Sequence, residues 1–102
     1  MAFAIVYSTI ESLRGIGPRI REIALRYGVS NVRVFGSVAR GTAREGSDVD
    51  LLVEMDDSRN LLDHVGFEQD IEDEPHTRVD VVVEGGIHPL LQPAILREAI
   101  AL

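Results

Sequence analysis

Residues 36–50 read GSVARGTAREGSDVD and join a glycine turn to a pair of carboxylates. Just before them stand the apolar residues Val32, Val34 and Phe35, whose composition predicts a buried strand. The strand is expected to end where Gly36-Ser37 reverses the chain, because glycine adopts backbone conformations that other residues avoid. The stretch therefore predicts a strand, a tight turn and a connection that leads to a second strand.

The Gly36-Ser37 turn is a candidate phosphate site. Glycine allows the backbone to come close to a ligand, and amide dipoles at the start of a following helical turn suit anionic oxygens. Ser37 adds a hydroxyl, and Arg40 and Arg44 add positive charge. A glycine turn alone is equally typical of an ordinary loop. The phosphate hypothesis therefore depends on the acidic residues that follow.

Two aspartates stand at alternate positions at the end of this stretch. Residues 48–53 read DVDLLV, and the period of two in a strand places Asp48 and Asp50 on one face. Like charges this close raise each other's proton affinity, so such a pair usually serves to hold a divalent cation. Oxygen ligands favour Mg²⁺ or Mn²⁺ over zinc. Surface acids on an edge strand are the alternative interpretation.

A third aspartate stands in a second strand signal. Residues 78–83 read RVDVVV, and their alternation places Asp80 on the face opposite its valine neighbours. If the two strands are adjacent, about 4.8 Å apart, Asp80 reaches the same cluster as Asp48 and Asp50. Two metal ions about 3.5 to 4 Å apart would then clamp the attacking and leaving oxygens of a phosphoryl displacement.

The combined pattern resembles the minimal nucleotidyltransferases of the DNA polymerase β superfamily. Its parts are Gly-Ser, ten intervening residues, Asp-x-Asp and, later, a lone Asp in a valine-rich strand. Residues 26–29 (RYGV) and the ending at 88–99 are also similar to that family, so the resemblance extends from about Leu13 to near the C-terminus. The segment between Glu54 and Arg78 is short and acidic for the family.

The resemblance implies a polymerase β-like nucleotidyltransferase fold and a role for each matching residue. Gly36 and Ser37 would bind the triphosphate of a nucleotide, most simply ATP. Asp48 and Asp50 would bind two Mg²⁺ ions, with Mn²⁺ as an alternative. Asp80 would complete the metal cluster and help to activate the acceptor hydroxyl.

The resemblance also implies a partner. Small members of the family act as antitoxins that adenylylate a tyrosine of a HEPN-domain ribonuclease toxin, so a hetero-oligomer with such a toxin is expected. Two other functions stay open. The chain would either neutralise its partner by binding alone or transfer a nucleotide to a small hydroxylated molecule such as an aminoglycoside. The absence of a second, acceptor-holding domain argues against the small molecule.

Size and composition narrow the possibilities. The 102 residues predict a single domain spanning 1–102. A formal net charge of −7 argues against DNA or RNA as the primary ligand, because a polyanionic backbone would repel the chain. No cysteine is present, so disulfides and thiolate metal sites are excluded. Without a basic leader or an apolar run of membrane-spanning length, a cytoplasmic protein is expected.

The remaining apolar pattern predicts the helices. A helix over Pro18–Tyr27 is followed by Gly28, and a shorter helical piece over Ser8–Arg14 precedes it. Another helix runs from about Asn60 to Glu74, capped by Asp57 or Ser58, and is expected to use Leu61, Leu62, Val65 and Ile71 as its apolar residues. A final helix starts near Pro93 and is expected to bury some combination of Ile95, Leu96, Ala99 and Ile100, with Arg97 and Glu98 facing water. The fold class is therefore α/β (α+β), with helices against a small mixed β-sheet.

Overall fold

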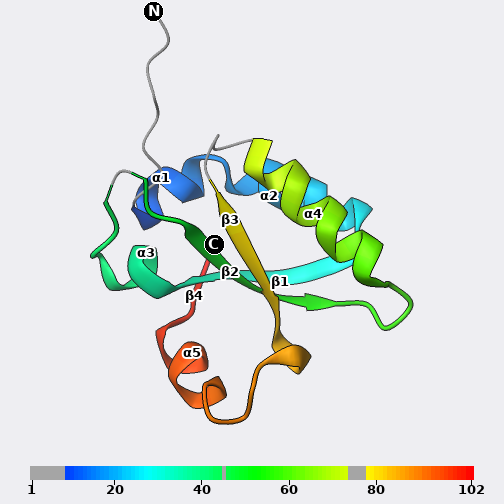
Figure 1. Cartoon of the computed structure of the whole chain (residues 1–102). Coiled ribbons are helices and arrows are strands. Elements are labelled where there is room, and N and C mark those ends of the chain that lie inside the picture. Colours follow the sequence, from blue (N-terminus) through cyan, green and yellow to red (C-terminus); the bar gives the residue numbers. More distant parts are fainter. Residues whose placement is uncertain (1–8, 45, 74–77) are drawn as a thin grey trace, which may run out of the picture.

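A four-stranded mixed sheet organises the chain (Figure 1). Its strands lie in the order β3-β2-β1-β4 and span Val29–Phe35 (β1), Val49–Met55 (β2), Val79–Val83 (β3) and Ile100–Ala101 (β4). Strand β1 runs antiparallel to both β2 and β4, whereas β2 and β3 are parallel. This computed structural model describes residues 9–44, 46–73 and 78–102. The predicted mixed sheet is confirmed, and the two aspartate-bearing strands are neighbours.

Helix α3 (Gly36–Arg40), described below, contributes Val38 to the apolar core on one face of the sheet, and three longer helices contribute most of its other helical residues. They are α1 (Ile10–Gly15), α2 (Gly17–Arg26) and α4 (Leu61–Asp73). The core residues are Leu13, Ile20, Ile23, Ala24, Val29, Val32, Val34, Val38, Val49, Leu51, Val53, Phe67, Ile71, Val79 and Val81. Strand alternation sends Val49, Leu51 and Val53 into this core, so Asp50 must point to the opposite face.

Short helical segments follow the ends of the strands. Helix α3 (Gly36–Arg40) begins directly after β1, and the 3₁₀ turn η1 (Glu84–Gly86) begins directly after β3. From η1 the chain passes through α5 (Gln92–Glu98) to β4, and so it crosses from one edge strand of the sheet to the other. The crossing brings α5 against α3 and η1 against β2. In the described residues, no helix combines the length and the apolar character needed to cross a membrane.

The first two helices agree with the sequence pattern. Helix α1 is capped by the Thr9 hydroxyl, which accepts a hydrogen bond from the Ser12 amide, and it ends at Gly15, one residue beyond the predicted end at Arg14. In α2, Ile20, Ile23 and Ala24 are buried, which confirms the predicted amphipathic face.

The predicted apolar face of α4 is wrong for Leu61, Leu62 and Val65 and confirmed for Ile71. Leu61, Leu62 and Val65 are 72%, 80% and 43% exposed, while Phe67 and Ile71 are buried. The predicted caps at Asp57 and Ser58 are also not used, because the Asn60 side chain accepts hydrogen bonds from the backbone amides at positions 62 and 63. This cap starts the helix with its first turn in solvent and only the later turns over the core. The predicted end near Glu74 and Pro75 lies outside the described residues.

The C-terminal prediction needs three corrections. None of the four apolar residues expected to be buried is fully buried, and Leu96 is 37% exposed. The last helix starts at Gln92, close to Pro93, but it ends at Glu98, and Ile100 pairs with Val34 in β4 instead of extending the helix. A two-residue strand of this kind depends on the free edge of β1, which local periodicity does not reveal. Glu98 does not face water as expected: its side chain is 27% exposed and contacts α3.

Candidate active site

The Gly36-Ser37 turn sits at the junction of β1 and α3. Gly36 is buried and has φ of +74°, a conformation that favours glycine. A side-chain carbon at this position would collide with Asp50 Oδ2. The absent side chain therefore lets the turn approach the acidic strand closely.

Ser37 is the second residue of α3. Amides in the first turn of a helix have no partner within the helix, so the Ser37 amide is available to a ligand. The structure records no hydrogen bond between the Ser37 hydroxyl and any residue that it describes. The Ser37 carbonyl accepts a hydrogen bond from the Thr42 amide at 2.9 Å. The carbonyl contact holds the turn in a folded loop and leaves the polar side chain half-exposed.

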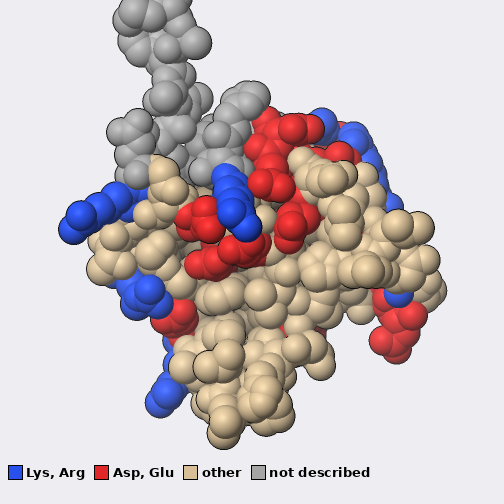
Figure 2. All heavy atoms as spheres, in the orientation of Figure 1, with Lys and Arg blue, Asp and Glu red and all other residues tan. Residues whose placement is uncertain are grey.

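The three predicted acids lie on one face of the sheet. In the parallel β2–β3 pair, Asp50 stands directly opposite Asp80, and Asp50 is also paired in register with Phe35 of β1, the residue before Gly36. Asp48 precedes Val49, the first residue of β2, and all three acids are half-buried. Figure 2 shows acidic side chains gathered on this face, over part of β3 and beside α4.

The electrostatics of Asp50 show that the acids influence one another. Burial is the largest cause that raises the pKa of Asp50, followed by the negative charges of Asp80 and Asp48. Arg40 lowers the pKa and Glu98 raises it further by smaller amounts. Asp50 therefore belongs to a like-charged cluster that is only partly compensated, as expected of residues that bind a cation.

The three acids share a face, but their side chains are not arranged as a metal-binding group. Across residues 9–44, 46–73 and 78–102, no group of three or more His, Cys, Asp or Glu side chains is arranged to hold a metal ion. The donor chemistry nevertheless fits a hard divalent cation, since every candidate ligand is a carboxylate oxygen.

Basic side chains near the site differ in their contacts. Arg40 Nη1 lies 3.1 Å from Glu98 Oε2, and Arg78 Nε lies 4.0 Å from Asp48 Oδ2. Arg78 is 73% exposed, so this pair is weak and its guanidinium is readily displaced. Arg44 is exposed, and its backbone amide donates to the Ser47 hydroxyl at 2.9 Å.

Glu98 is the residue that the sequence analysis missed. Its Oε1 atom accepts a hydrogen bond from the Gly36 amide at 2.8 Å, across a separation of 62 residues. No motif around Glu98 points to this contact, and the helix pattern placed its side chain in water. Only the crossing of the chain from β3 to β4 brings it to the turn.

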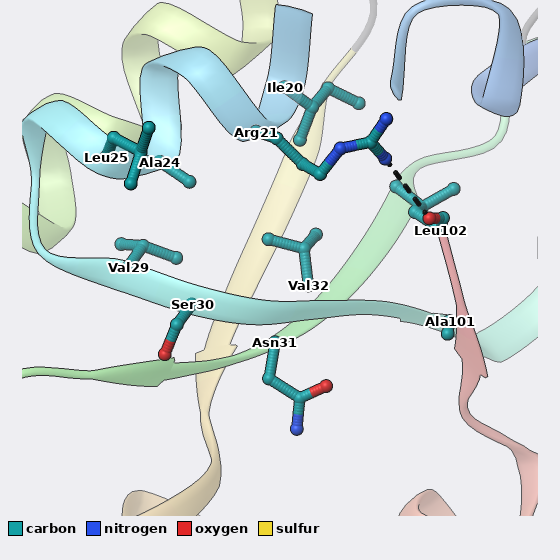
Figure 3. A pocket seen from close by; sticks show the side chains of 10 residues that line it. All are labelled: Ile20, Arg21, Ala24, Leu25, Val29, Ser30, Asn31, Val32, Ala101 and Leu102. Carbon is teal, nitrogen blue, oxygen red and sulfur yellow. Dashed lines mark hydrogen bonds between the residues drawn. The ribbon is translucent and has the colours of Figure 1, made fainter. Parts of the chain in front are cut away.

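A separate groove of about 440 Å³ lies between α2, β1 and β4 (Figure 3). Its lining includes Ile20, Ala24 and Val32, together with Arg21, which donates to the Leu102 carbonyl at 3.3 Å. The groove contains none of the three aspartates and no residue of the Gly36-Ser37 turn. It therefore offers an apolar surface without acid–base chemistry.

Comparison with known proteins gives one family and close relatives. The profile described as "Nucleotidyltransferase domain" matches residues 18–102. A protein of Methanocaldococcus jannaschii, named provisionally as a protein adenylyltransferase, is 39% identical over 89 residues, which cover 87% of this chain and 96% of that relative. The protein adenylyltransferase MntA of Thermococcus cleftensis is 36% identical over 80 residues, covering 78% of this chain and 81% of the relative.

Solved structures agree with the sequence comparison. A structure described provisionally as a minimal nucleotidyltransferase superposes with a TM-score of 0.81 at 48% identity, covering 90% of this chain and 94% of that one. A toxin–antitoxin structure with AMP-PNP superposes with a TM-score of 0.71 over 82% of this chain and 69% of that one. At 19% identity, the second match shows similarity of fold alone. The expected minimal nucleotidyltransferase fold is confirmed.

Proposed function

Because the chain belongs to the nucleotidyltransferase domain family, we propose that it transfers AMP from ATP to a tyrosine hydroxyl of a partner protein. In this proposal the partner is a HEPN-domain ribonuclease toxin, and the modification makes this chain its antitoxin. The relatives named as protein adenylyltransferases support a protein acceptor. The toxin–antitoxin neighbour with AMP-PNP supports an adenine nucleotide and a toxin partner.

The close approach of Gly36 to Asp50 is the observation that carries the proposal. The glycine turn and the acids are the two parts that nucleotidyl transfer needs, since one binds phosphate oxygens and the other binds the cation that neutralises them. Register then adds Asp80 directly opposite Asp50. A chance surface acid would not explain a glycine whose missing side chain makes room for that acid's carboxylate.

Each residue has a defined task in the reaction. The Ser37 amide and hydroxyl bind triphosphate oxygens, with Arg44 adding positive charge. Asp80 accepts the proton of the acceptor hydroxyl while the oxygen of that hydroxyl forms a bond to the α-phosphorus of ATP. The bond from that phosphorus to the bridging oxygen of the β-phosphate breaks, and pyrophosphate leaves. Gly36 allows the turn to lie beside the acids, and Arg40 holds positive charge near Asp50.

Asp48, Asp50 and Asp80 would hold Mg²⁺ in this scheme. When bound, the cation neutralises the negative charge that develops on the phosphate oxygens. Burial and, after it, the negative charges of Asp80 and Asp48 raise the pKa of Asp50, and this proximity of like charges supports the assignment. Arg78 near Asp48 would move into solvent, and its high exposure makes that movement easy.

Transfer of label from ATP to a purified partner tests the proposal. The chain is recovered from native cells with its bound partner, and the pair is incubated with Mg²⁺ and ATP labelled at the α-phosphate. We expect label on a tyrosine of the partner, with the mass of one added AMP in tandem mass spectrometry. ATP labelled at the γ-phosphate should leave the partner unlabelled, because that phosphate leaves with pyrophosphate.

Variants separate catalysis from simple binding. The double variant Asp48→Asn, Asp50→Asn should lose transfer and also lose protection of cells that express the toxin. Glu54→Gln is the matched control, because Glu54 lies on the same strand but is exposed and is not part of the acid cluster. Protection by the double variant at equal expression would show that binding alone neutralises the partner. Label on an added aminoglycoside, with none on protein, would favour the small-molecule acceptor.

A further inference from the structure

One carboxylate holds both ends of helix α3. Glu98 Oε1 accepts from the amide of Gly36, the first residue of α3, at 2.8 Å. Nη1 of Arg40, the last residue of the same helix, lies 3.3 Å from Oε1 and 3.1 Å from Oε2 of Glu98. Glu98 thus contacts the candidate phosphate turn on one side and a candidate phosphate-binding arginine on the other.

The backbone of Glu98 is fixed by the sheet. Helix α5 ends at Glu98, Ala99 is extended, and Ile100 pairs with Val34 of β1. Gly36 follows β1 immediately, so the donor and the acceptor of the 2.8 Å hydrogen bond are anchored to the same strand. The side chain is 27% exposed, against 54% for Arg40. Glu98 is consequently part of the framework of the site and not a mobile side chain at its rim.

The Gly36 turn needs such a contact. A glycine restricts its own backbone less than any other residue does, so its neighbours must set the direction of the amides around it. Asp50 packs against the α-carbon side of Gly36, and Glu98 binds its amide. Together they constrain the backbone at Gly36 and with it the direction of the amide of the following residue, Ser37.

Charge explains the contact with Arg40. A lone carboxylate beside a triphosphate site would repel the nucleotide. Nη1 of Arg40 lies within 3.3 Å of both Glu98 oxygens, so the guanidinium compensates that charge where the nucleotide would approach. Arg40 then contributes to binding through Glu98 and is not required to contact the phosphates.

We propose that Glu98 is a positioning residue that orients the Gly36-Ser37 turn for the triphosphate, with Arg40 as its counter-ion. This inference deepens the proposed function and rests on its assignment of the turn to phosphate binding. It also reassigns Arg40 from a phosphate ligand to a support of Glu98. A different role for Glu98 predicts the opposite effect: a carboxylate that merely occupies the anion site would be displaced by ATP, and its removal would tighten nucleotide binding.

Binding of AMP-PNP in Mg²⁺, measured by calorimetry without any acceptor, tests the inference. Glu98→Ala should weaken binding by about tenfold, the lower range for loss of a hydrogen bond to a charged acceptor. Glu98→Gln keeps an oxygen that accepts from the Gly36 amide, so it should recover most of the affinity. With a protein acceptor, Glu98→Ala should raise KM for ATP by a similar factor and leave KM for the acceptor unchanged.

A double-variant cycle tests the role of Arg40. If Arg40 acts through Glu98, the variant Glu98→Ala, Arg40→Ala should bind AMP-PNP no more weakly than Glu98→Ala alone. Glu22→Ala is the matched control, because it removes an exposed glutamate that pairs with Arg19 at 3.1 Å and Arg26 at 3.5 Å on α2. That control should bind the nucleotide like the wild type.

Several results would overturn the inference. The first is that both Glu98 variants are folded and bind AMP-PNP as tightly as the wild type or more tightly. The second is that adding Arg40→Ala to Glu98→Ala lowers the affinity for AMP-PNP further. The third is that the wild-type chain binds no AMP-PNP. Circular dichroism of each variant establishes folding, and Glu98→Gln preserves the test if Glu98→Ala does not fold. A wild type that binds AMP-PNP but transfers no AMP to protein would contradict the proposed function alone.

Discussion

Oδ2 of Asp50 occupies the space in which residue 36 would carry a side-chain carbon. A carbon built on Gly36 would also lie 3.1 Å from the carboxyl carbon of Asp50. The Gly36-Ser37 turn, which is the candidate phosphate site, and the acidic strand therefore touch because residue 36 is a glycine. This relationship makes the site sensitive to changes too small to disturb the rest of the fold.

Gly36→Ala is expected to damage both stability and activity. The left-handed backbone costs a non-glycine residue roughly 1–2 kcal/mol, and the new methyl group also displaces the Asp50 carboxylate. Because small misplacements of catalytic groups have large effects, transfer of AMP should fall by about a hundredfold. Urea denaturation and α-labelled ATP measure the two effects.

Gly41→Ala is the control for this substitution. Gly41 has nearly the same φ, +76°, but nothing lies within 4 Å of a side-chain carbon placed there. The variant should lose a similar amount of stability from backbone strain and keep its activity. Equal losses of activity in the two variants would show that strain, and not the contact with Asp50, is responsible.

Asp50→Asn is expected to stabilise the protein without metal at neutral pH. Burial, Asp80 and Asp48 raise the pKa of Asp50 above its ordinary value of 3.8. A carboxyl with a higher pKa in the folded state binds its proton more tightly when folded, so its ionisation destabilises the fold. This destabilisation is fully present above the folded-state pKa and vanishes as the pH falls below 3.8.

Thermal unfolding in EDTA over a range of pH measures this effect. The melting temperature of Asp50→Asn should exceed that of the wild type most at about pH 7, and the difference should shrink toward about pH 4. Glu54→Gln, on the exposed end of β2, should show no such dependence. An advantage of Asp50→Asn that stays constant with pH would mean that charge is not its origin.

Local pattern was sufficient to predict where the candidate site residues lie, but not all of their contacts. Strand alternation is a property of neighbouring residues, so Asp48, Asp50 and Asp80 could be assigned to one face before their strands were known to pair. Gly36 was identified in the same way from a short motif. The Glu98 contact spans 62 residues and depends on where α5 and β4 end, which no local pattern encodes.

The fold was likewise predictable where it depends on local sequence pattern. The order of the first strands and helices follows from apolar runs and turn residues, and the mixed sheet could be anticipated from them. The apolar face of α4 could not be predicted in this way. Leu61, Leu62 and Val65 are apolar, as a buried helix face requires, but they lie in the part of the helix that extends beyond the core. Tertiary position overrode helical periodicity there, as it did for Ile100 in β4.

Mg²⁺ is expected to raise the melting temperature of the wild type. A cation that binds only the folded acids stabilises the protein by mass action, by roughly 2.7 kcal/mol at a hundredfold excess over Kd. AMP-PNP should enlarge the shift, because its phosphates supply further oxygen ligands. Differential scanning fluorimetry at constant ionic strength measures both additions.

The double variant Asp48→Asn, Asp50→Asn should lose the shift caused by Mg²⁺. Glu54→Gln should keep it, since Glu54 lies at the far end of β2 from the cluster. An equal shift in the double variant and the wild type would assign the stabilisation to surface charge in general. That result would argue against a metal site at the three acids.

Helix α4 supplies hydrogen-bonding partners for the open edge of β3. Glu68 Oε2 accepts from the Val81 amide at 3.0 Å, and Glu72 Oε2 accepts from the Val79 amide at 3.4 Å. The Val81 carbonyl lies 2.8 Å from His64 Nε2, which therefore donates to it. These side chains stand four residues apart on α4, so one face of the helix binds the backbone of an edge strand that carries Asp80.

Glu68→Ala is therefore expected to destabilise the protein by about 1–2 kcal/mol, because the Val81 amide loses a charged acceptor at a half-buried position. An uncovered edge strand also pairs readily with other chains, so the variant should aggregate faster at equal concentration. Urea denaturation and light scattering measure the two effects. Gln69→Ala, the exposed neighbour on the same helix, is the control and should change neither. If Glu68→Ala behaved like that control, water would be an adequate partner for the Val81 amide, and the helix would not be needed to protect this edge.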